Sequence, residues 1–154
     1  MKHLAKILLF VHLCTSPLSV LADDAEINRL LDGFHDDAAN ARFDSYFNRF
    51  AEEGYFLGTD ASERWSVSEF RQYAKPSFDA GRGWTYVVVE RNLRVEGDTA
   101  WFDEQLNNSR FGRCRGTGVL ILENEKWKIA HYSLTLLIPN EIAEQVGKLS
   151  MDSF

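Results

Sequence analysis

The N-terminal part of the chain has hydrophobic positions every three or four residues, a spacing that predicts helices. The first helix is expected from Asp24 onward. Its inner face consists of Ile27, Leu30, Leu31, Phe34 and Ala38. A second, short helix is expected from Asp44 until Gly54 breaks it. This helix has an aromatic inner face made of Tyr46, Phe47 and Phe50.

A short strand, Tyr55-Phe56-Leu57, and a turn at Gly58-Thr59-Asp60 separate the second helix from a third. Ser66 or Ser68 caps this third helix, and Pro76 bends or ends it. Its inner positions are Phe70, Tyr73 and Ala74.

After Gly83 the chain changes to runs rich in Trp, Tyr, Val, Phe and Ile, which predict strands. The expected strands span residues 84–95, 99–107, 112–122 and 126–137, with turn signals between them. They form an antiparallel meander, and a short C-terminal helix opens at Pro139-Asn140. Helices followed by strands indicate an α+β fold.

Alternation along these strands sorts their side chains onto two faces of the sheet. One face is mostly apolar and collects Val87, Val89, Leu93, Val95, Ala100, Phe102, Leu106, Val119, Ile121, Ala130, Leu134 and Leu136. The same face receives Arg91, Glu104, Arg115, Thr117 and Tyr132. Counting through two-residue turns places Arg91 opposite Glu104, and Glu104 opposite Arg115. A carboxylate is therefore expected between two guanidinium groups.

The opposite face carries Trp84, Trp101 and Trp127, together with Cys114 and His131. A face with three tryptophans is too aromatic for free solvent, and it predicts contact with a second copy of the chain about a two-fold axis. We therefore expect a homodimer.

The N-terminus has the three parts of a secretion signal. Lys2 and Lys6 flank the start of an apolar run over residues 7–11, and Val20-Leu21-Ala22 suits cleavage by signal peptidase. The apolar run is too short and interrupted to span a bilayer, which takes roughly 20 apolar residues. We expect residues 1–22 to be a signal peptide and residues 23–154 to form one domain, periplasmic or secreted, in a bacterium.

Cleavage removes Lys2 and Lys6, which moves the net charge from −6 to about −8. An acidic chain without a basic stripe suits neither nucleic acid nor an anionic membrane. Cys14 leaves with the signal, so Cys114 has no disulfide partner within the chain. No ligand set stands at metal-binding spacing, and no Gly-rich phosphate loop is present. We expect no metal and no cofactor.

Several motifs coincide with one family. They are Phe56-Leu57-Gly58-Thr59-Asp60 followed by Glu63-Arg64-Trp65, Gly83-Trp84-Thr85-Tyr86, Ala100-Trp101-Phe102-Asp103-Glu104, Cys114-Arg115-Gly116-Thr117-Gly118-Val119-Leu120 and Trp127-Lys128-Ile129-Ala130. With the order of elements, they make residues 24–150 resemble the SnoaL-like, nuclear transport factor 2-like (NTF2-like) superfamily, which includes ketosteroid isomerase. The resemblance implies a cone, in which a strongly curved antiparallel sheet wraps around the N-terminal helices and encloses a mostly apolar pocket. It implies no single chemistry, because members include isomerases, dehydratases, hydrolases and non-catalytic binders.

Glu104 is the first candidate for a catalytic residue, as a general acid or base in an apolar cavity. Alternatively, it belongs to a buried ion network that fixes the sheet. In a third interpretation it orients Arg91 and Arg115 as a clamp for the carboxylate of an anionic ligand. His131 is the second catalytic candidate, because a bulge in the last strand would bring it to the inner side.

Further ligand contacts are expected from the sheet and from the segment around the third helix; they are Tyr132, Thr117, Asp60, Trp65 and Tyr73. The plainer interpretation of Asp60 is a turn or a helix cap, and that of Tyr73 is a side chain of the core. Together these features predict an exported protein that binds a small, partly apolar molecule. The alternatives are a general acid-base enzyme, which would be an isomerase, dehydratase or hydrolase, and a non-catalytic assembly module.

Overall fold

The computed structural model describes residues 17–151, with side chains from Asp23 onward. Residues 1–16, which hold most of the expected signal peptide, lie outside the described residues. The helices are α1 (Pro17–Ala39), α2 (Phe43–Phe47), α3 (Val67–Asp79) and α4 (Asn140–Met151). The strands are β1 (Phe50–Leu57), β2 (Arg64–Ser66), β3 (Val87–Glu96), β4 (Thr99–Asn108), β5 (Gly112–Glu123) and β6 (Lys126–Leu136).

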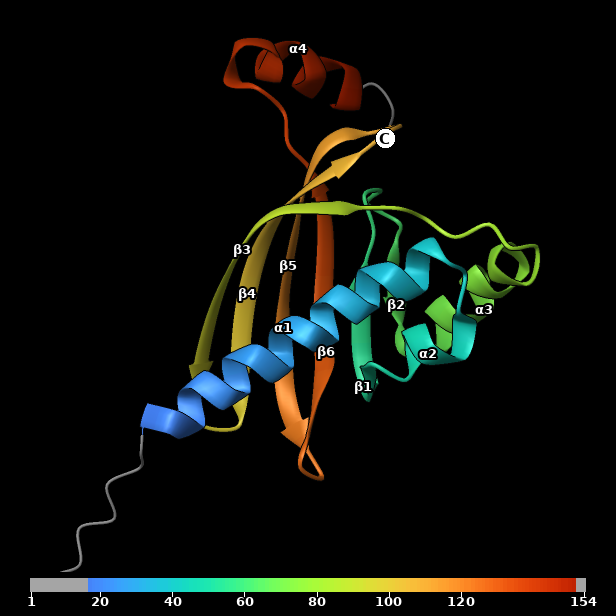
Figure 1. Ribbon diagram of the computed structural model, residues 1–154. Helices are drawn as coiled ribbons and strands as arrows, with labels where there is room; N and C mark the ends of the chain where they lie inside the picture. The colour runs from blue at the N-terminus through green and yellow to red at the C-terminus, as the bar shows by residue number, and fades with distance from the viewer. Residues whose placement is uncertain (1–16, 152–154) are drawn as a thin grey trace, which may run out of the picture.

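A six-stranded sheet with the order β2-β1-β6-β5-β4-β3 forms the body of the molecule. Strands β3 to β6 form the expected antiparallel meander, and β1 pairs with β6 in parallel. Helix α1 crosses one face of the curved sheet, and α2 and α3 lie toward the β1–β2 end (Figure 1). The predicted α+β fold is confirmed. We call the face toward α1 the inner face and the opposite one the outer face.

The helices differ from the prediction at their ends. Helix α1 starts at Pro17, ahead of Asp24, and includes Ala22, where cleavage is expected. Helix α2 ends at Phe47, because Phe50 already belongs to β1, where it pairs with Ile129 of β6. Helix α3 continues past Pro76 to Asp79, because burial of Phe78 stabilises its last turn.

Of the two expected caps, Ser66 starts α3. Its hydroxyl accepts a hydrogen bond from the Glu69 backbone N–H at 3.3 Å, and the Glu69 carboxylate accepts one from the Ser66 N–H at 2.8 Å. This reciprocal pair is a capping box. It turns the chain from β2 directly into α3 and so fixes Trp65 next to the start of that helix.

The register of the meander is confirmed on one side of Glu104 and wrong on the other. Arg91 pairs with Glu104 as predicted, but Glu104 pairs with Gly116, and Arg115 pairs with Gln105. The cause is the β4–β5 connection, which closes at the pair Asn108 and Gly112 rather than through a two-residue turn. Because side chains alternate, a shift by one residue sends all of β5 to the other face.

Two β-bulges reverse the alternation within β3 and β6. In β3 the extra residue is Val89, between the pairs Val88–Leu106 and Glu90–Gln105. In β6 it is Ala130, since Leu120 pairs with Ile129 and Val119 pairs with His131. Each bulge bends its strand and increases the local twist.

The tryptophans therefore do not share one face, and that part of the prediction is wrong. Trp127 is buried, and Trp84 packs against the core. Trp101 lies on the outer face and is 44% exposed. Val87 and Val89, which were expected inside, are also exposed. The outer face thus keeps a smaller apolar surface than predicted.

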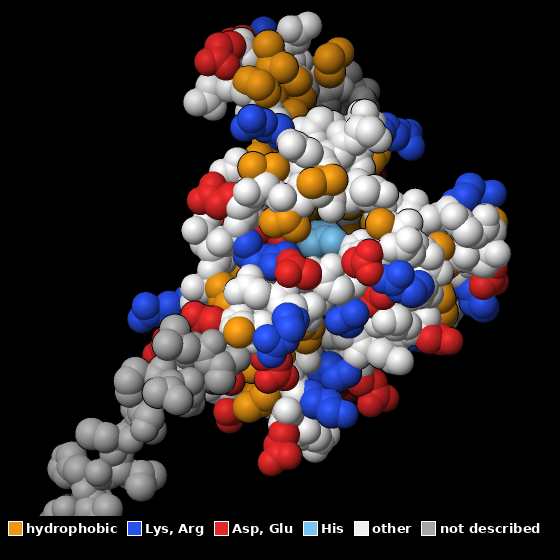
Figure 2. Space-filling view, viewed as in Figure 1, with side chains coloured by type: hydrophobic (Ala, Val, Ile, Leu, Met, Phe, Trp, Pro, Cys, Tyr) orange, Lys and Arg blue, Asp and Glu red, His pale blue; other side chains and the backbone are white. Residues whose placement is uncertain are grey.

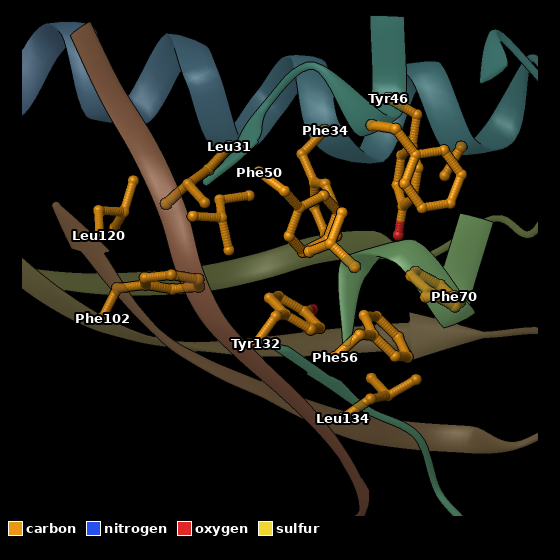
Figure 3. Packing of buried hydrophobic residues seen from close by; sticks show 14 of the residues in the cluster. Leu31, Phe34, Tyr46, Phe50, Phe56, Phe70, Phe102, Leu120, Tyr132 and Leu134 are labelled. Carbon is orange, nitrogen blue, oxygen red and sulfur yellow. The ribbon is translucent and has the colours of Figure 1, made fainter. Parts of the chain in front are cut away.

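The core is an aromatic layer between the helices and the inner face of the sheet, as Figure 3 shows. Its rings come from α1, α2, α3, β1, β4 and β6, and include Phe34, Tyr46, Phe50, Phe56, Phe70, Phe102 and Tyr132. Phe34 stacks on Tyr46 with a centroid distance of 4.7 Å, and Phe56 stacks on Phe70 at 4.0 Å. Phe34 of α1 also contacts Tyr132 of β6 at a centroid distance of 5.0 Å, which positions α1 over the sheet.

Helix α4 stands apart from this core (Figure 1), and none of its residues is buried. Hydrophobic side chains gather on it in Figure 2, and Ile142 is among the exposed ones. The core described above is therefore complete without α4.

Candidate functional site

Four polar side chains meet on the inner face beneath α1, and we call them the Glu104 cluster: His35, Arg91, Glu104 and Tyr132. The Glu104 side chain is 0% exposed. Its Oε1 lies 2.6 Å from His35 Nε2 and accepts a hydrogen bond from the Tyr132 hydroxyl at 3.1 Å. Its Oε2 accepts one from Arg91 Nε at 3.0 Å. Both carboxylate oxygens are therefore engaged by protein groups.

Arg91 connects this cluster to helix α1. Its Nη1 donates to Asp32 Oδ1 at 2.9 Å and to Asn28 Oδ1 at 3.1 Å. Its Nη2 is buried and has no partner among the described residues. The Arg91 guanidinium thus links α1 to the Glu104 carboxylate by hydrogen bonds. It is not available, together with Arg115, to bind the carboxylate of a ligand.

The surroundings keep Glu104 ionised. Burial opposes its charge, but the hydrogen bond from His35 and the charges of His35 and Arg91 outweigh burial and lower the pKa of Glu104. Burial, reinforced by the Glu104 carboxylate, raises the pKa of Tyr132 well above its usual range. Tyr132 is therefore a neutral donor, and Glu104 is a fixed acceptor rather than a source of protons.

Gly116 leaves room for these contacts. A Cβ atom at this position would lie 2.3 Å from the Tyr132 hydroxyl oxygen and 2.8 Å from Glu104 Oε1. No side chain fits there without moving one of the two groups. The contact between Tyr132 and Glu104 therefore requires a glycine at position 116, opposite Glu104 on β5.

His35 is the member of the cluster that the sequence analysis misses. It follows Ile27 and Leu31 at intervals of four residues, so it lies on the buried face of α1. A histidine in an otherwise apolar helical stripe is the signal that could have found it. Its partner Glu104 is 69 positions away, which no local pattern reveals.

A cavity of about 260 Å³ opens at the end of the sheet near α3, and we call it the mouth cavity. Its wall is largely aromatic, with Phe56, Trp65, Phe70, Tyr73, Trp84 and Tyr86. Glu63 and Arg110 add charged groups at the wall. The volume lies just below the range of about 300–1,000 Å³ usual for ligand pockets, so the cavity suits only a small molecule.

A second, much smaller space of about 10 Å³ lies next to it, and we call it the inner cavity. It shares Phe56, Trp84, Tyr86 and Leu134 with the mouth cavity. His35, Tyr46 and Tyr132 also line it. Two members of the Glu104 cluster, His35 and Tyr132, thus face the inner cavity, and no member lines the mouth cavity.

The predicted site residues divide between these places. Glu104, Arg91 and Tyr132 come together as described, whereas Arg115 and Thr117 lie on the outer face because of the β5 register. The expected bulge in β6 exists, but it turns Trp127 and Ile129 inward and leaves His131 on the outer face. The structure therefore does not join His131 to Glu104.

Around the mouth, Trp65 and Tyr73 line the cavity, and their role as ligand contacts stays a prediction. Asp60 does not line it, and its carboxylate accepts hydrogen bonds from the backbone N–H and the hydroxyl of Ser62. This is the alternative in which Asp60 stabilises a turn. Cys114 is buried, and burial raises the pKa of its thiol, as suits a structural residue.

Within residues 17–151 no helix is long and apolar enough to cross a membrane. The described side chains also contain no group of three or more metal-ligating residues.

The sequence profile of the SnoaL-like domain matches residues 27–139. The chain therefore belongs to the SnoaL-like family, and its structure has the NTF2-like fold. No curated protein shows significant sequence similarity to it.

Solved structures support the fold at low identity. A cystatin-like fold protein of unknown function from Nostoc punctiforme has a TM-score of 0.62 and 20% identity, covering 77% of this chain and 93% of that one. An NTF2-like protein of unknown function from Pseudomonas putida has a TM-score of 0.66 and 11% identity, covering 79% and 91%. A putative dehydratase of the NTF2-like family from Streptomyces avermitilis has a TM-score of 0.65 and 12% identity, covering 78% and 99%.

Proposed function

We propose that this protein is an exported binding protein for a small planar molecule with an aromatic ring, held in the mouth cavity. The observation that carries the proposal is the set of near-parallel rings along the cavity wall. Trp65 stacks on Tyr73 at a centroid distance of 4.5 Å, and on Phe70 at 5.5 Å with an interplanar angle of 9°. A ligand ring can extend such a stack, and aromatic pairs contribute about 0.5–1.5 kcal/mol beyond area burial.

The position of the Glu104 cluster favours binding over catalysis. Both oxygens of Glu104 are occupied by protein donors, and His35 and Tyr132 face a space of only about 10 Å³. A ring in the mouth cavity would contact Trp65, Tyr73 and Trp84 without reaching the carboxylate. The cluster then serves to hold α1, β3, β4 and β6 together behind the ligand.

The four tryptophans allow a direct test with toluene as the probe. In indole N–H NMR spectra, toluene is expected to shift the signals of Trp65 and Trp84, which line the mouth, and to leave the signals of Trp101 and Trp127 unchanged. Trp65→Leu should weaken toluene binding several-fold, and Trp101→Leu serves as the matched control on the outer face. Shifts of all four signals, or of none, would contradict the proposal.

Export rests on the sequence of residues 1–22. The full chain, produced in a bacterium with a periplasm, should be recovered from the periplasmic fraction with an N-terminus at Asp23. Replacing the apolar residues Leu8 and Leu9 by Asp should hold the chain in the cytoplasm at full length. Recovery of the unchanged chain only from the cytoplasm would rule out export by this segment.

A homodimer is proposed through the outer face, where Val87, Val89 and Trp101 remain exposed. Exposed aliphatic and aromatic side chains on a sheet face are typical of a surface that contacts another protein. The exposed apolar surface that supports a dimer is smaller than the sequence predicts, because Trp84 and Trp127 face inward.

Acid-base catalysis is the second candidate function, and the His35–Glu104 contact of 2.6 Å favours it. A histidine oriented by an ionised carboxylate is a common arrangement for a general base. Deuterium exchange at the methyl group of acetophenone in D2O tests for such a base. Acceleration by the wild type that is lost in His35→Asn would support catalysis, and equal rates with and without protein would count against it.

A further inference from the structure

We propose that the ligand of the mouth cavity is an aryl compound whose oxygen projects into the inner cavity and accepts a hydrogen bond from the Tyr46 hydroxyl. This inference rests on the proposed binding function and adds the chemical class of the ligand. The class is a single aromatic ring that bears a hydrogen-bond-accepting oxygen, such as an aryl ketone.

Tyr46 carries the argument because its hydroxyl proton is buried without an acceptor. The residue is 0% exposed, and its hydroxyl forms no well-formed hydrogen bond among the described residues, although the indole N–H of Trp84, a donor, approaches its oxygen. Buried polar donors in proteins almost always have an acceptor, because a buried donor without one has lost its hydrogen bond to water and gained none in return. Figure 3 shows the Tyr46 side chain reaching from the helical layer toward the sheet, with its oxygen at the inner end.

The protein supplies no acceptor for the Tyr46 proton. The neighbouring Trp84 ring, 5.8 Å away between centroids, has an indole N–H that can only donate. The Tyr132 hydroxyl donates to Glu104, and it forms no hydrogen bond with Tyr46. Burial also raises the pKa of Tyr46 well above its usual range, with the Trp84 indole opposing the shift only in part. The phenol therefore keeps its proton and remains a donor.

The inner cavity has the size of one such acceptor atom. Its volume of about 10 Å³ is close to the space that one water-sized group requires. Tyr46 lines it, and four of its residues also line the mouth cavity. A ring stacked near Trp65 and Trp84 can thus place a substituent oxygen against Tyr46 without the whole ligand entering.

The matched probes are acetophenone and α-methylstyrene, which differ by C=O against C=CH2. Titrations followed on the Trp84 indole signal give a dissociation constant for each compound. In the wild type the ratio of the two constants should favour acetophenone by about tenfold more than in Tyr46→Phe, the factor that about 1.4 kcal/mol of hydrogen-bond free energy gives. Tyr46→Phe should bind α-methylstyrene as the wild type does.

Tyr73→Phe is the control, because its side chain lines the mouth cavity but not the inner one. It should keep the wild-type ratio. Thermal unfolding tests whether Tyr46→Phe remains folded, and its Tm should not fall, because the lost hydroxyl proton has no acceptor in the free protein.

An unchanged ratio in Tyr46→Phe would overturn this inference and leave the proposed binding function intact, since both compounds would still bind. If neither compound binds the wild type or any variant, both the proposed binding function and this inference are overturned. A water molecule held by Tyr46 in place of a ligand oxygen would appear as the first of these results.

Discussion

His35 Nε2 and Glu104 Oε1 lie 2.6 Å apart and join helix α1 to strand β4 in the interior. Because the pKa of Glu104 is lowered, its carboxylate only accepts, and the shared proton belongs to His35 Nε2. The contact thus fixes the orientation of the imidazole ring. It also leaves Nδ1 as the ring nitrogen without a hydrogen bond among the described residues.

The first prediction concerns that proton. Nitrogen-15 NMR at neutral pH should show a proton on His35 Nε2 that exchanges slowly with solvent, because Glu104 is fully buried. His131 on the outer face is the control and should exchange faster. A proton found on Nδ1 alone would contradict the assignment.

Glu104→Gln should lower the free energy of unfolding by about 3 kcal/mol, the usual cost of breaking a buried ion pair. The variant leaves the charge of Arg91 without its buried partner, although Asp32 remains. Urea unfolding followed by Trp fluorescence measures the loss. Asp103→Asn, one position earlier on the outer side of β4, is the matched control and should unfold at nearly the wild-type urea concentration.

Lowering the pH should remove the stabilisation that the ionised Glu104 carboxylate contributes. In the unfolded chain Glu titrates near about 4.3, and in the folded protein the pKa of Glu104 lies lower. The stabilisation is therefore complete above the unfolded pKa and is lost as the pH falls through the folded pKa. Urea unfolding at a series of pH values should show a steeper loss on the acid side for the wild type than for Glu104→Gln. Parallel curves would mean that Glu104 has no lowered pKa.

Gly116→Ala should destabilise the protein by about 2 kcal/mol, as overpacking of an interior does. The added methyl group would approach the Tyr132 hydroxyl and Glu104 closer than van der Waals contact allows. Gly147→Ala in α4 is the control, since a Cβ there meets nothing within 4 Å, and it should not lower the Tm. Equal melting temperatures for the two variants would show that the cluster tolerates the methyl group.

Trp101→Glu tests the proposed homodimer. A charge placed among the exposed apolar side chains of the outer face should disrupt an interface there and give a monomeric mass in sedimentation experiments. Tyr73→Glu adds the same charge at an exposed position of α3 and should leave the mass unchanged. A wild type that is already monomeric would remove the dimer proposal.

Much of the fold could be predicted because its signals are local. The spacing of Ile27, Leu31 and Phe34 fixes the buried face of α1, and the turn at Gly97 separates β3 from β4 in the predicted register. The start of β1 could not be predicted in this way. Phe50 lies in a strand because its backbone partner is Ile129 of β6, which is remote in sequence.

The candidate site could be predicted only where the connection between strands is short. The predicted pairing of Arg91 with Glu104 across the turn at Gly97 is confirmed. The predicted pairing of Arg115 with Glu104 is wrong, because the β4–β5 connection is one residue longer than a two-residue turn and closes at Asn108 and Gly112. Tyr46 and His35 depend on neighbours from other elements, so their roles follow only from the packed structure.

The bulges at Val89 and Ala130 have a consequence for how this fold can diversify. Deleting either residue would restore regular alternation while keeping Arg91, Tyr132 and their neighbours turned inward. What would be lost is the bend, since each bulge curves its strand. Two aliphatic residues that make no polar contact, Val89 and Ala130, thus set how strongly the inner face of the sheet curves. Insertions and deletions, rather than substitutions, would be the changes that deepen or flatten it.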